Sequence, residues 1–414
     1  MSNATPARRQ HVIGSDREAI GIAYDVAARL AREAIARDRD RRLPHDEMDM
    51  LSESGLLAIS VPRSHGGAGA SVATIAEVLR ILSVADPAIG QLPQNHFVFI
   101  EAIAQDGSEA QKDFFYAELL AGARFGNAQA ERGSGSALDM ATRLLPTGDG
   151  YRLNGTKYYC TGAILADWIP VAALDKDDRQ ILAYVRRDAP GVEVLPDWNA
   201  IGQRTTFSGT THLRDVAVEQ SQVIPHWQLF DRPTLFHSFG VLLHAAVDVG
   251  IARAALEDTI RLIRSRGRPR LGAPVLFAVD DPHLLSRLGE LIVRLHGLEA
   301  LLAEAARLHD RIGRSPDATQ VAEAMVMAGA AKAHAEDVGL EIASELFALT
   351  GSASTDAAQA LDRHWRNLRT HSVHDANQWR YHQVGAWRVN GTAPSLPRRR
   401  RATDKNGTAK GSAA

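Results

Sequence analysis

The sequence has one cysteine, no excess of either charge and no long apolar run. Cys160 alone excludes an internal disulfide framework and a cysteine-rich metal site, which fits a reducing cytoplasm. Lysine and arginine total 47 against 49 acidic residues, so no global positive field favours nucleic acid. No stretch approaches the ~20 apolar residues of a membrane span, and residues 1–14 lack the apolar core of a secretory signal. We expect a cytoplasmic protein with no nucleic-acid or membrane partner.

The 414 residues are 45% apolar, enough for one large core or two to three modest ones. The first part has helical periodicity, with one apolar stripe at Ala19, Ile22, Ala23, Val26, Ala27 and Leu30. Three glycines and a proline predict a loop over residues 61–70. We expect a flexible N-terminus over residues 1–14 and a helical domain over residues 15–121.

Between residues 122 and 230 the pattern changes to short β-branched and aromatic runs. Asn154-Gly155 between residues 151–153 and 156–159 predicts a tight hairpin. Further strands are predicted at Trp168–Leu174, Gln180–Arg186, Val192–Leu195 and Thr211–Val218. Their regular spacing is typical of a small antiparallel barrel.

After Pro233 the helical period returns. Apolar positions step by threes and fours along one helix face at Leu284, Leu288, Leu291, Leu295, Leu298 and Leu302. Asp281-Pro282, Asp317 and Asp356 are predicted helix starts. We expect a four-helix bundle over residues 231–395 and a disordered, solvated basic tail over residues 396–414. The fold class predicted is α+β.

Helices, a β domain and a helical bundle in this order resemble the acyl-CoA dehydrogenase superfamily over about residues 15–395. Residues 126–136 (GNAQAERGSGS) and 155–162 (GTKYYCTG) are similar to its two flavin-facing segments. Residues 202–208 and 213–216 are similar to the β segment that follows. Two positions depart from the family pattern, with Arg132 in place of a proline and Ala137 in place of an aspartate.

The resemblance implies a flavin at the central domain. A flavin needs hydrogen-bond donors at its pyrimidine edge and close approach of backbone, which glycine permits. The cofactor-binding residues implied are Asn127, Gln129, Glu131, Gly135, Ser136, Tyr159, Cys160, Thr161, Arg266, Arg268 and Gly351. The alternative is that the glycines serve ordinary loops and that Thr161 is a hydrogen-bonded strand hydroxyl.

Several further segments resemble one branch of the superfamily, the sulfur-acquisition oxidoreductases of dimethyl sulfone use, relatives of dibenzothiophene monooxygenase. They are residues 92–97, 230–234, 362–367, 370–375 and 379–385. This resemblance implies a homotetramer, built as a dimer of dimers, that oxygenates a small organosulfur substrate. Reduced FMN would come from a separate flavin reductase and form a flavin hydroperoxide with oxygen.

Two departures from thioester dehydrogenases favour this branch. A dehydrogenase needs a carboxylate to remove the α proton, and Asp375, one methylene shorter than the usual glutamate, is what this chain offers. Around residues 349–355, the loop that receives the ADP half of FAD retains one glycine, Gly351, which favours FMN over FAD. An FAD-dependent acyl-CoA dehydrogenase with Asp375 as base stays the alternative, and a flavin-fold protein without turnover is a third.

In the relatives, residues matching His96, His371 and His374 lie near the flavin ring. Imidazole suits proton transfer there because its pKa is near neutral. We therefore predict His96, His371, His374 and Asp375 as catalytic residues, against the alternative that single histidines are surface or structural residues. His371 and His374 lack a recognised ligand motif, so no metal is predicted.

Overall fold

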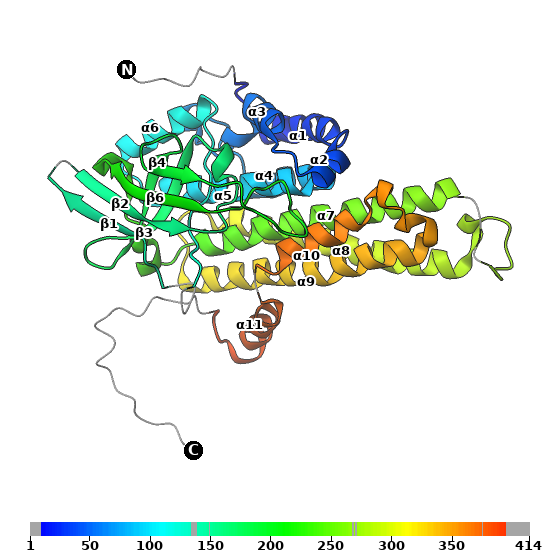
Figure 1. Cartoon of the computed structure of the whole chain (residues 1–414). Helices are drawn as coiled ribbons and strands as arrows, with labels where there is room; N and C mark the ends of the chain where they lie inside the picture. The colour runs from blue at the N-terminus through cyan, green and yellow to red at the C-terminus, as the bar shows by residue number, and fades with distance from the viewer. Residues whose placement is uncertain are drawn as a thin grey trace.

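The computed structural model describes residues 10–133, 139–148, 150–266, 269, 271–374 and 376–394 (Figure 1). In Figure 1, the helices of the first part lie along the long helices of the last part, and the sheet lies at one end of both. The chain thus passes from helices to a sheet and back to helices. This architecture confirms the predicted α+β fold class.

The N-terminal helices bury the apolar stripe predicted for them, with only Ile22 left half-buried. They are α1 (Asp16–Leu30), α2 (Ala34–Asp40), α3 (His45–Glu53), α4 (Val72–Ala85), α5 (Pro87–Asp106) and α6 (Glu109–Leu120). The Ser15 side chain caps α1 by accepting from the Glu18 N–H. Residues 10–14 are packed rather than free, since Ile13 is buried and the His11 N–H donates to the Glu53 carbonyl.

One seven-stranded sheet follows, in the order β5-β6-β2-β1-β3-β4-β7. Its strands are β1 (Arg143–Thr147), β2 (Gly150–Lys157), β3 (Trp168–Leu174), β4 (Gln180–Arg186), β5 (Val192–Val194), β6 (Thr211–Val218) and β7 (Val223–Ile224). Three strands match their predicted ranges, and β5 ends one residue early. The sheet is mixed rather than purely antiparallel, because β1 and β3 pair in parallel.

The hairpin predicted at Asn154-Gly155 is wrong. Strand β2 runs straight through both residues, and the tight connection lies earlier, where Thr147 of β1 pairs with Gly150 of β2. The pairing of β2 with β6 shifts register between Leu153 and Gly155, so this pair marks a bulge. A Cβ at Gly155 would lie 2.2 Å from the Thr142 Oγ1 atom. Close packing, not a turn, therefore explains the glycine.

The C-terminal helices are α7 (Phe236–Arg266), α8 (Pro282–Ile312), α9 (Ala318–Thr350), α10 (Asp362–Ser372) and α11 (Asn377–Asn390). Asp281 caps α8 and Asp317 forms a capping box on α9, as predicted. Asp356 caps only a short 3-10 turn at Ala357–Gln359, and α10 begins later. Helix α7 is apolar enough to span a membrane, but 78% of its most apolar window is buried, which makes it a core helix.

The six leucines of the predicted stripe on α8 are all buried within a single chain. Packing inside the subunit therefore accounts for them, and these leucines are not available for contacts between subunits. Most of the alanines along α9 are buried in the same way. A homotetramer would have to use other faces, and it stays a prediction.

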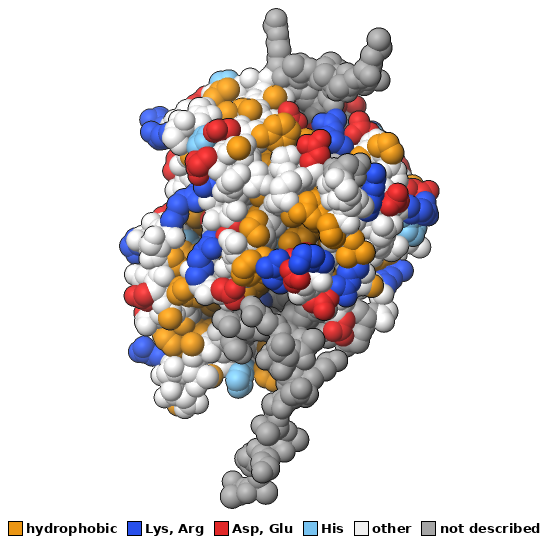
Figure 2. Space-filling view, turned by 90° about the vertical axis from the view of Figure 1, so that its left-hand side faces the viewer, with side chains coloured by type: hydrophobic (Ala, Val, Ile, Leu, Met, Phe, Trp, Pro, Cys, Tyr) orange, Lys and Arg blue, Asp and Glu red, His pale blue; other side chains and the backbone are white. Residues whose placement is uncertain are grey.

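Charged side chains of both signs are interspersed on the face of the molecule drawn in Figure 2, with apolar side chains between them. This pattern agrees with the formal net charge of -2. It gives that face no field of a single sign that could attract a polyanion.

The close approach at Gly155 predicts a stability difference between two glycine variants. Gly155→Ala should lower the free energy of unfolding by about 1–3 kcal/mol, because the new methyl group overlaps Thr142. Gly289→Ala in α8, where a Cβ meets no atom within 4 Å, should raise it by up to about 1 kcal/mol. Denaturant titration measures both. A Gly155→Ala protein as stable as its parent would contradict the packing.

Candidate functional site

A chain of three buried hydroxyl groups lies after strand β2. The Thr161 and Ser208 Oγ atoms are 2.8 Å apart, as are those of Ser208 and Thr206, and Thr206 donates to the Gln203 carbonyl at 2.9 Å. A carbonyl can only accept, so each hydroxyl must donate toward Gln203. Thr161 thus uses its proton on Ser208 and presents lone pairs on its other side. From the sequence alone, this hydroxyl could donate or accept, and the hydrogen-bond chain makes it an acceptor for any further partner.

Three other predicted residues gather beside Thr161. The Asn127 N–H donates to the Thr161 carbonyl, and its side-chain amide donates to the Tyr159 carbonyl at 3.1 Å. The Gln129 amide donates to the Asn127 Oδ1 atom at 3.2 Å. Tyr159 has a φ of 57°, a left-handed conformation that is strained for a bulky residue, and strain of this kind often collects at functional sites.

Gln203 was not among the predicted site residues. Its backbone N–H donates to the Asn367 Oδ1 atom at 2.6 Å, which ties the loop after β5 to helix α10. Its side chain is 1% exposed, and both atoms of its amide lack a hydrogen-bond partner within the described residues. An unsatisfied buried amide costs about 1–3 kcal/mol, so this one is suited to a bound molecule.

His96 does not have a ring nitrogen available for proton transfer. Its Nε2 donates to the Leu57 carbonyl at 2.7 Å, and its Nδ1 accepts from the Phe125 N–H at 3.0 Å. Burial lowers the pKa of His96 to about 4. The geometry fixes a neutral ring that joins α5 to the segment before the sheet, which favours the structural alternative for this histidine.

The Glu131 carboxylate also has its hydrogen-bond partners within the protein. Its carboxylate accepts from the buried Lys157 ammonium at 2.7 Å, from the Thr142 hydroxyl at 2.7 Å and from the Ala141 N–H at 2.7 Å. Burial alone would raise its pKa, but these partners, led by Lys157, lower it to about 2. Glu131 therefore anchors residues 141 and 142 and neutralises Lys157, rather than facing a cofactor.

The Cys160 side chain lies inside the sheet domain core and is fully buried. Burial raises the pKa of its thiol to about 12, so the thiol is neutral and unreactive. Its side chain packs with the core residues of the sheet domain, which favours a structural role for the thiol, and the predicted cofactor contact of Cys160 stays a prediction.

Gly135, Ser136, Arg268 and Asp375 lie outside the described residues, and so does the side chain of Arg266. The location of Arg266 is still known from its backbone, because Arg266 is the last residue of helix α7, 18 residues after Asp248. At 1.5 Å per residue, these two positions are roughly 27 Å apart along the helix. Gly351 follows α9 with a φ of 79°, 19 residues after Lys332, so it lies roughly 28 Å along the helix axis from the level of Lys332.

A buried polar array crosses the bundle from α9 to α10. The Lys332 ammonium lies 2.9 Å from Asp248 Oδ2, and Asp248 Oδ1 lies 2.6 Å from His371 Nδ1. The His371 Nε2 atom in turn lies 3.0 Å from His244 Nδ1. Lys332, Asp248 and His371 are each at most 3% exposed. Burial alone would raise the pKa of Asp248, but Lys332 and His371 outweigh it and lower the pKa.

His374 completes the array at the surface. Its ring stacks on His244, with centroids 4.4 Å apart and an interplanar angle of 29°, and the residue is exposed. The predicted catalytic residues His371 and His374 thus both contact His244, which the sequence analysis did not single out. The sequence does contain a signal for His244: His244 and Asp248 are polar residues four positions apart on the otherwise apolar helix α7, so they lie on the same helix face.

Helix α10 brings the hydroxyl chain and the histidine array together. Asn367 holds Gln203, and His371 follows one turn later on the same helix face. Gly202 reinforces the contact, since a Cβ there would lie 1.9 Å from the Arg366 carbonyl. The loop after β5 therefore packs directly on the helix that carries His371.

Helix α5 makes a second connection between the two clusters. Its Leu92 lies within 3.1 Å of where a Cβ of Gly162 would be, next to Thr161. Its Gln94 amide donates at 3.5 Å to the carbonyl of Gly240, one turn before His244. Thr161, Gln203, His244 and His371 therefore surround one region between the sheet and the bundle.

Three sequence profiles match the chain, those of the N-terminal, middle and C-terminal domains of acyl-CoA dehydrogenase, over residues 23–123, 126–216 and 242–379. Dibenzothiophene monooxygenase of Rhodococcus erythropolis is 34% identical over 406 residues, covering 93% of this chain and 97% of the relative. The chain belongs to the acyl-CoA dehydrogenase family. The resemblance inferred from the sequence is confirmed.

Two solved structures of this family share the architecture closely. FMN-bound TdsC from Paenibacillus sp. A11-2 superposes with a TM-score of 0.87 at 30% identity, over 91% of this chain and 98% of that one. Methanesulfinate monooxygenase MsuC from Pseudomonas fluorescens superposes with a TM-score of 0.84 at the same identity and coverage. The likeness extends over all three parts of the family fold.

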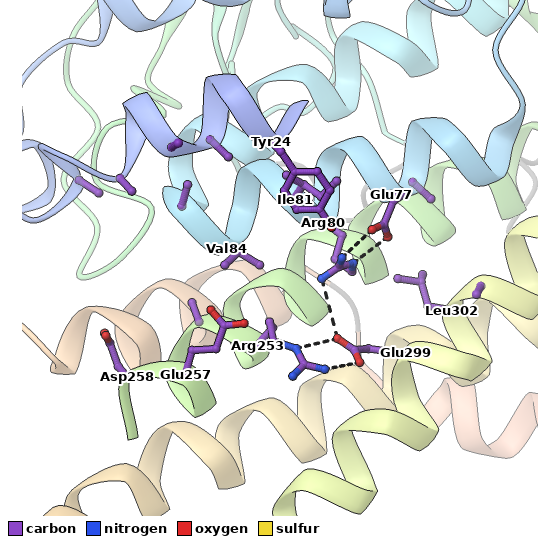
Figure 3. A pocket seen from close by; sticks show the side chains of 18 of the residues that line it. Tyr24, Glu77, Arg80, Ile81, Val84, Arg253, Glu257, Asp258, Glu299 and Leu302 are labelled. Atoms are coloured by element: carbon purple, nitrogen blue, oxygen red, sulfur yellow. Dashed lines mark hydrogen bonds and ion pairs between the residues drawn. The ribbon is translucent and has the colours of Figure 1, made fainter. Parts of the chain in front are cut away.

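A cavity of about 1060 Å³ lies elsewhere, between α1, α4, α7 and α8 (Figure 3). Its walls are rich in alanine, and half-buried charges on its walls pair with one another: Arg80 pairs with Glu77, and Arg253 pairs with Glu299. No described residue predicted to bind the cofactor lines it. The array and the hydroxyl chain are therefore the better candidate site.

The ion pair of Glu131 and Lys157 predicts a pH-dependent stability. Glu131→Gln should cost about 3–5 kcal/mol near pH 7, because it leaves the buried Lys157 ammonium without a counter-charge. Since the folded pKa of about 2 is below the ordinary value of 4.5, the carboxylate stabilises the fold above that value. Its contribution is lost as the pH falls toward about 2.

Denaturant titration from about pH 7 to about pH 2 tests this. The stability difference between parent and Glu131→Gln should shrink with acidity. The double variant Glu131→Gln/Lys157→Met, which removes both charges, should recover most of the loss at neutral pH. A difference that stays constant with pH would show that the carboxylate is not the source.

Proposed function

We propose that the protein is a two-component, FMNH2-dependent monooxygenase that oxygenates a small organosulfur compound, with a separate flavin reductase supplying the reduced FMN. Two findings together support this proposal. The whole chain is similar to FMN-bound TdsC and to methanesulfinate monooxygenase MsuC. The region between the sheet and the bundle contains an array of hydrogen-bonded histidines that can accept and donate protons.

The donor set around Thr161 fits a flavin ring. Gln203 offers an unsatisfied amide donor and acceptor, which suits the alternating carbonyl and N–H groups of the pyrimidine edge. The Thr161 hydroxyl, fixed as an acceptor, suits a ring N–H. We propose that these two residues, with Asn127 and Tyr159 supporting the backbone, hold the cofactor. When bound, reduced FMN would supply the two electrons that reduce one atom of dioxygen to water while the other goes to substrate.

A contact between the cofactor and Arg266 would involve a second subunit. Along α7, Arg266 lies roughly 27 Å from the level of Asp248, farther than one FMN molecule extends. Arg266 would then meet a flavin held by a neighbouring copy of the chain. That geometry supports the expected homotetramer, in the cytoplasm, as part of the same proposal.

An acyl-CoA dehydrogenase activity is the second candidate, favoured by the matching family profiles. It needs a carboxylate with substantial basicity to remove the α proton of a thioester. Asp248, the carboxylate in the array, is unsuited, because Lys332 and His371 occupy it and lower its pKa. The dehydrogenase alternative therefore depends on Asp375.

Flavin binding and oxygen use separate the two activities. The protein should bind FMN more tightly than FAD in a fluorescence titration. With a reductase, NADH, FMN and an atmosphere of 18O2, it should convert dimethyl sulfone or methanesulfinate to a product that carries one 18O atom. A thioester such as butyryl-CoA should not bleach the bound flavin without oxygen. Tighter FAD binding together with thioester bleaching would return the protein to the dehydrogenases.

Variants at adjacent positions distinguish the same chemistries. His374→Ala should lower coupled product formation by on the order of a hundredfold, the usual size for losing an acid–base group, while hydrogen peroxide is released. Asp375→Asn should have a milder effect on oxygenation, although it would abolish thioester-driven bleaching in a dehydrogenase. Product yield and peroxide are measured together. Wild-type coupling in His374→Ala would exclude the histidine from proton transfer.

A further inference from the structure

The hydroxyl chain of Thr161, Ser208 and Thr206 is shielded from water. Thr206 is fully buried, Ser208 is 4% exposed and Thr161 is 6% exposed. Two hydrogen bonds of 2.8 Å join the three oxygen atoms, and a third bond of 2.9 Å ends on the Gln203 carbonyl. Because protein rather than bulk water surrounds these groups, the protein sets the direction in which the hydroxyls point.

The Gln203 carbonyl determines the direction of every bond in the series. A carbonyl oxygen and a hydroxyl oxygen 2.9 Å apart attract each other only with a hydrogen between them, and only the Thr206 hydroxyl can supply it. A hydroxyl has a single hydrogen, so Thr206 must accept from Ser208, and Ser208 must accept from Thr161. The Thr161 oxygen then has lone pairs, and no hydrogen, for a further partner.

The proposed flavin site therefore offers two hydrogen-bond acceptors, the Thr161 hydroxyl oxygen and the unsatisfied Oε1 atom of Gln203. Oxidised FMN has one ring N–H, at N3, whereas reduced FMN has a further N–H at N5. The second acceptor of the site thus finds a donor only on the reduced ring. On the oxidised ring N5 is itself an acceptor, so a lone pair of Thr161 would meet a lone pair there.

We propose that the hydroxyl chain makes the site select reduced FMN over oxidised FMN, with Ser208 and Thr206 as positioning residues that act through Thr161. This inference rests on the proposed monooxygenase function and deepens it. A two-component enzyme must take reduced FMN from a pool that also contains the oxidised form, and must release oxidised FMN after turnover. A hydrogen bond that exists with only one redox state of the flavin serves both steps.

Thr206→Val removes the hydrogen that gives the hydroxyl chain its direction. Valine has the shape of threonine, and the Gln203 carbonyl keeps two other donors, the Trp198 Nε1 atom at 2.9 Å and the backbone N–H of residue 206 at 3.3 Å. In the variant, Ser208 has lost its acceptor and can donate to Thr161, whose own hydrogen is then free for the flavin. The substitution thus changes the hydrogen-bonding role of Thr161 from two hydrogen bonds away.

Thr259→Val on α7 is a matched control. Thr259 is 1% exposed, and its hydroxyl donates to the Ala255 carbonyl at 2.7 Å, the same kind of local bond that Thr206 makes. Within the described residues, the Thr259 hydroxyl is hydrogen-bonded to no second hydroxyl. Thr259→Val therefore measures the loss of a buried hydroxyl alone. Thr206→Ser, which keeps the hydroxyl, is the conservative variant that should retain the direction.

The test measures the dissociation constants of oxidised FMN and, without oxygen, of reduced FMN, by fluorescence and absorbance titration of the full-length protein. Wild type, Thr206→Ser and Thr259→Val should bind reduced FMN more tightly than oxidised FMN, by on the order of tenfold. In Thr206→Val this ratio should fall by on the order of tenfold, as expected for one lost hydrogen bond. For a two-electron couple, the fall lowers the reduction potential of the bound flavin by about 30 mV.

Equal affinities of wild type for the two forms, or an unchanged ratio in Thr206→Val, would overturn the inference. An equal fall in Thr259→Val would also overturn it, because the effect would then come from the loss of any buried hydroxyl. Should Thr206→Val not fold, Ser208→Ala breaks the same hydroxyl chain and should lower the ratio in the same direction. A wild-type protein that shows the expected ratio but oxygenates neither dimethyl sulfone nor methanesulfinate would instead refute the monooxygenase function.

Discussion

Two opposite charges buried together in the C-terminal bundle determine how several elements meet. Lys332 reaches from α9 to Asp248 on α7, and the same carboxylate holds His371 of α10. Neither charge can be left alone in an apolar core, so the three helices keep one relative position. Helix α10 then presents Asn367 to Gln203, and the Arg366 carbonyl to Gly202. The position of a loop in the sheet domain thus depends on an ion pair in the bundle.

The direction of hydrogen bonds matters as much as the identity of the residues in this site. Three hydroxyls in series end on a carbonyl, which makes Thr161 an acceptor although a threonine hydroxyl can play either role. An ionised carboxylate at the other cluster, Asp248, requires the His371 Nδ1 atom to carry a hydrogen. In both clusters, a group that cannot change its hydrogen-bonding role determines the roles of groups that can.

The sequence predicted well what depends on local pattern. The leucine stripe on α8, the caps at Asp281 and Asp317, and the limits of β3, β4 and β6 are short-range features. The Asn154-Gly155 turn failed because a local signal competed with a long-range one. Gly155 is required by its contact with Thr142, which lies on another segment.

The candidate site was predicted in part, for the same reason. Resemblance located His371 and Thr161, but Asp248 is 123 residues away from His371, and no periodicity connects them. Glu131 lies in a motif similar to a flavin-facing segment, yet its carboxylate is used by Lys157. Histidine is a residue type suited to catalysis, but both ring nitrogens of His96 are hydrogen-bonded to backbone groups. Only contacts between distant segments distinguish these cases.

The anchoring of residues 141 and 142 by Glu131 also bears on how this protein can diverge. The carboxylate joins the two ends of the connection between residues 131 and 141, so the span between them is closed independently of its own sequence. The entropy of closing such a span grows only slowly with its length. A change in the length of that connection would therefore cost little free energy of loop closure, as long as Glu131 keeps its contacts with residues 141 and 142.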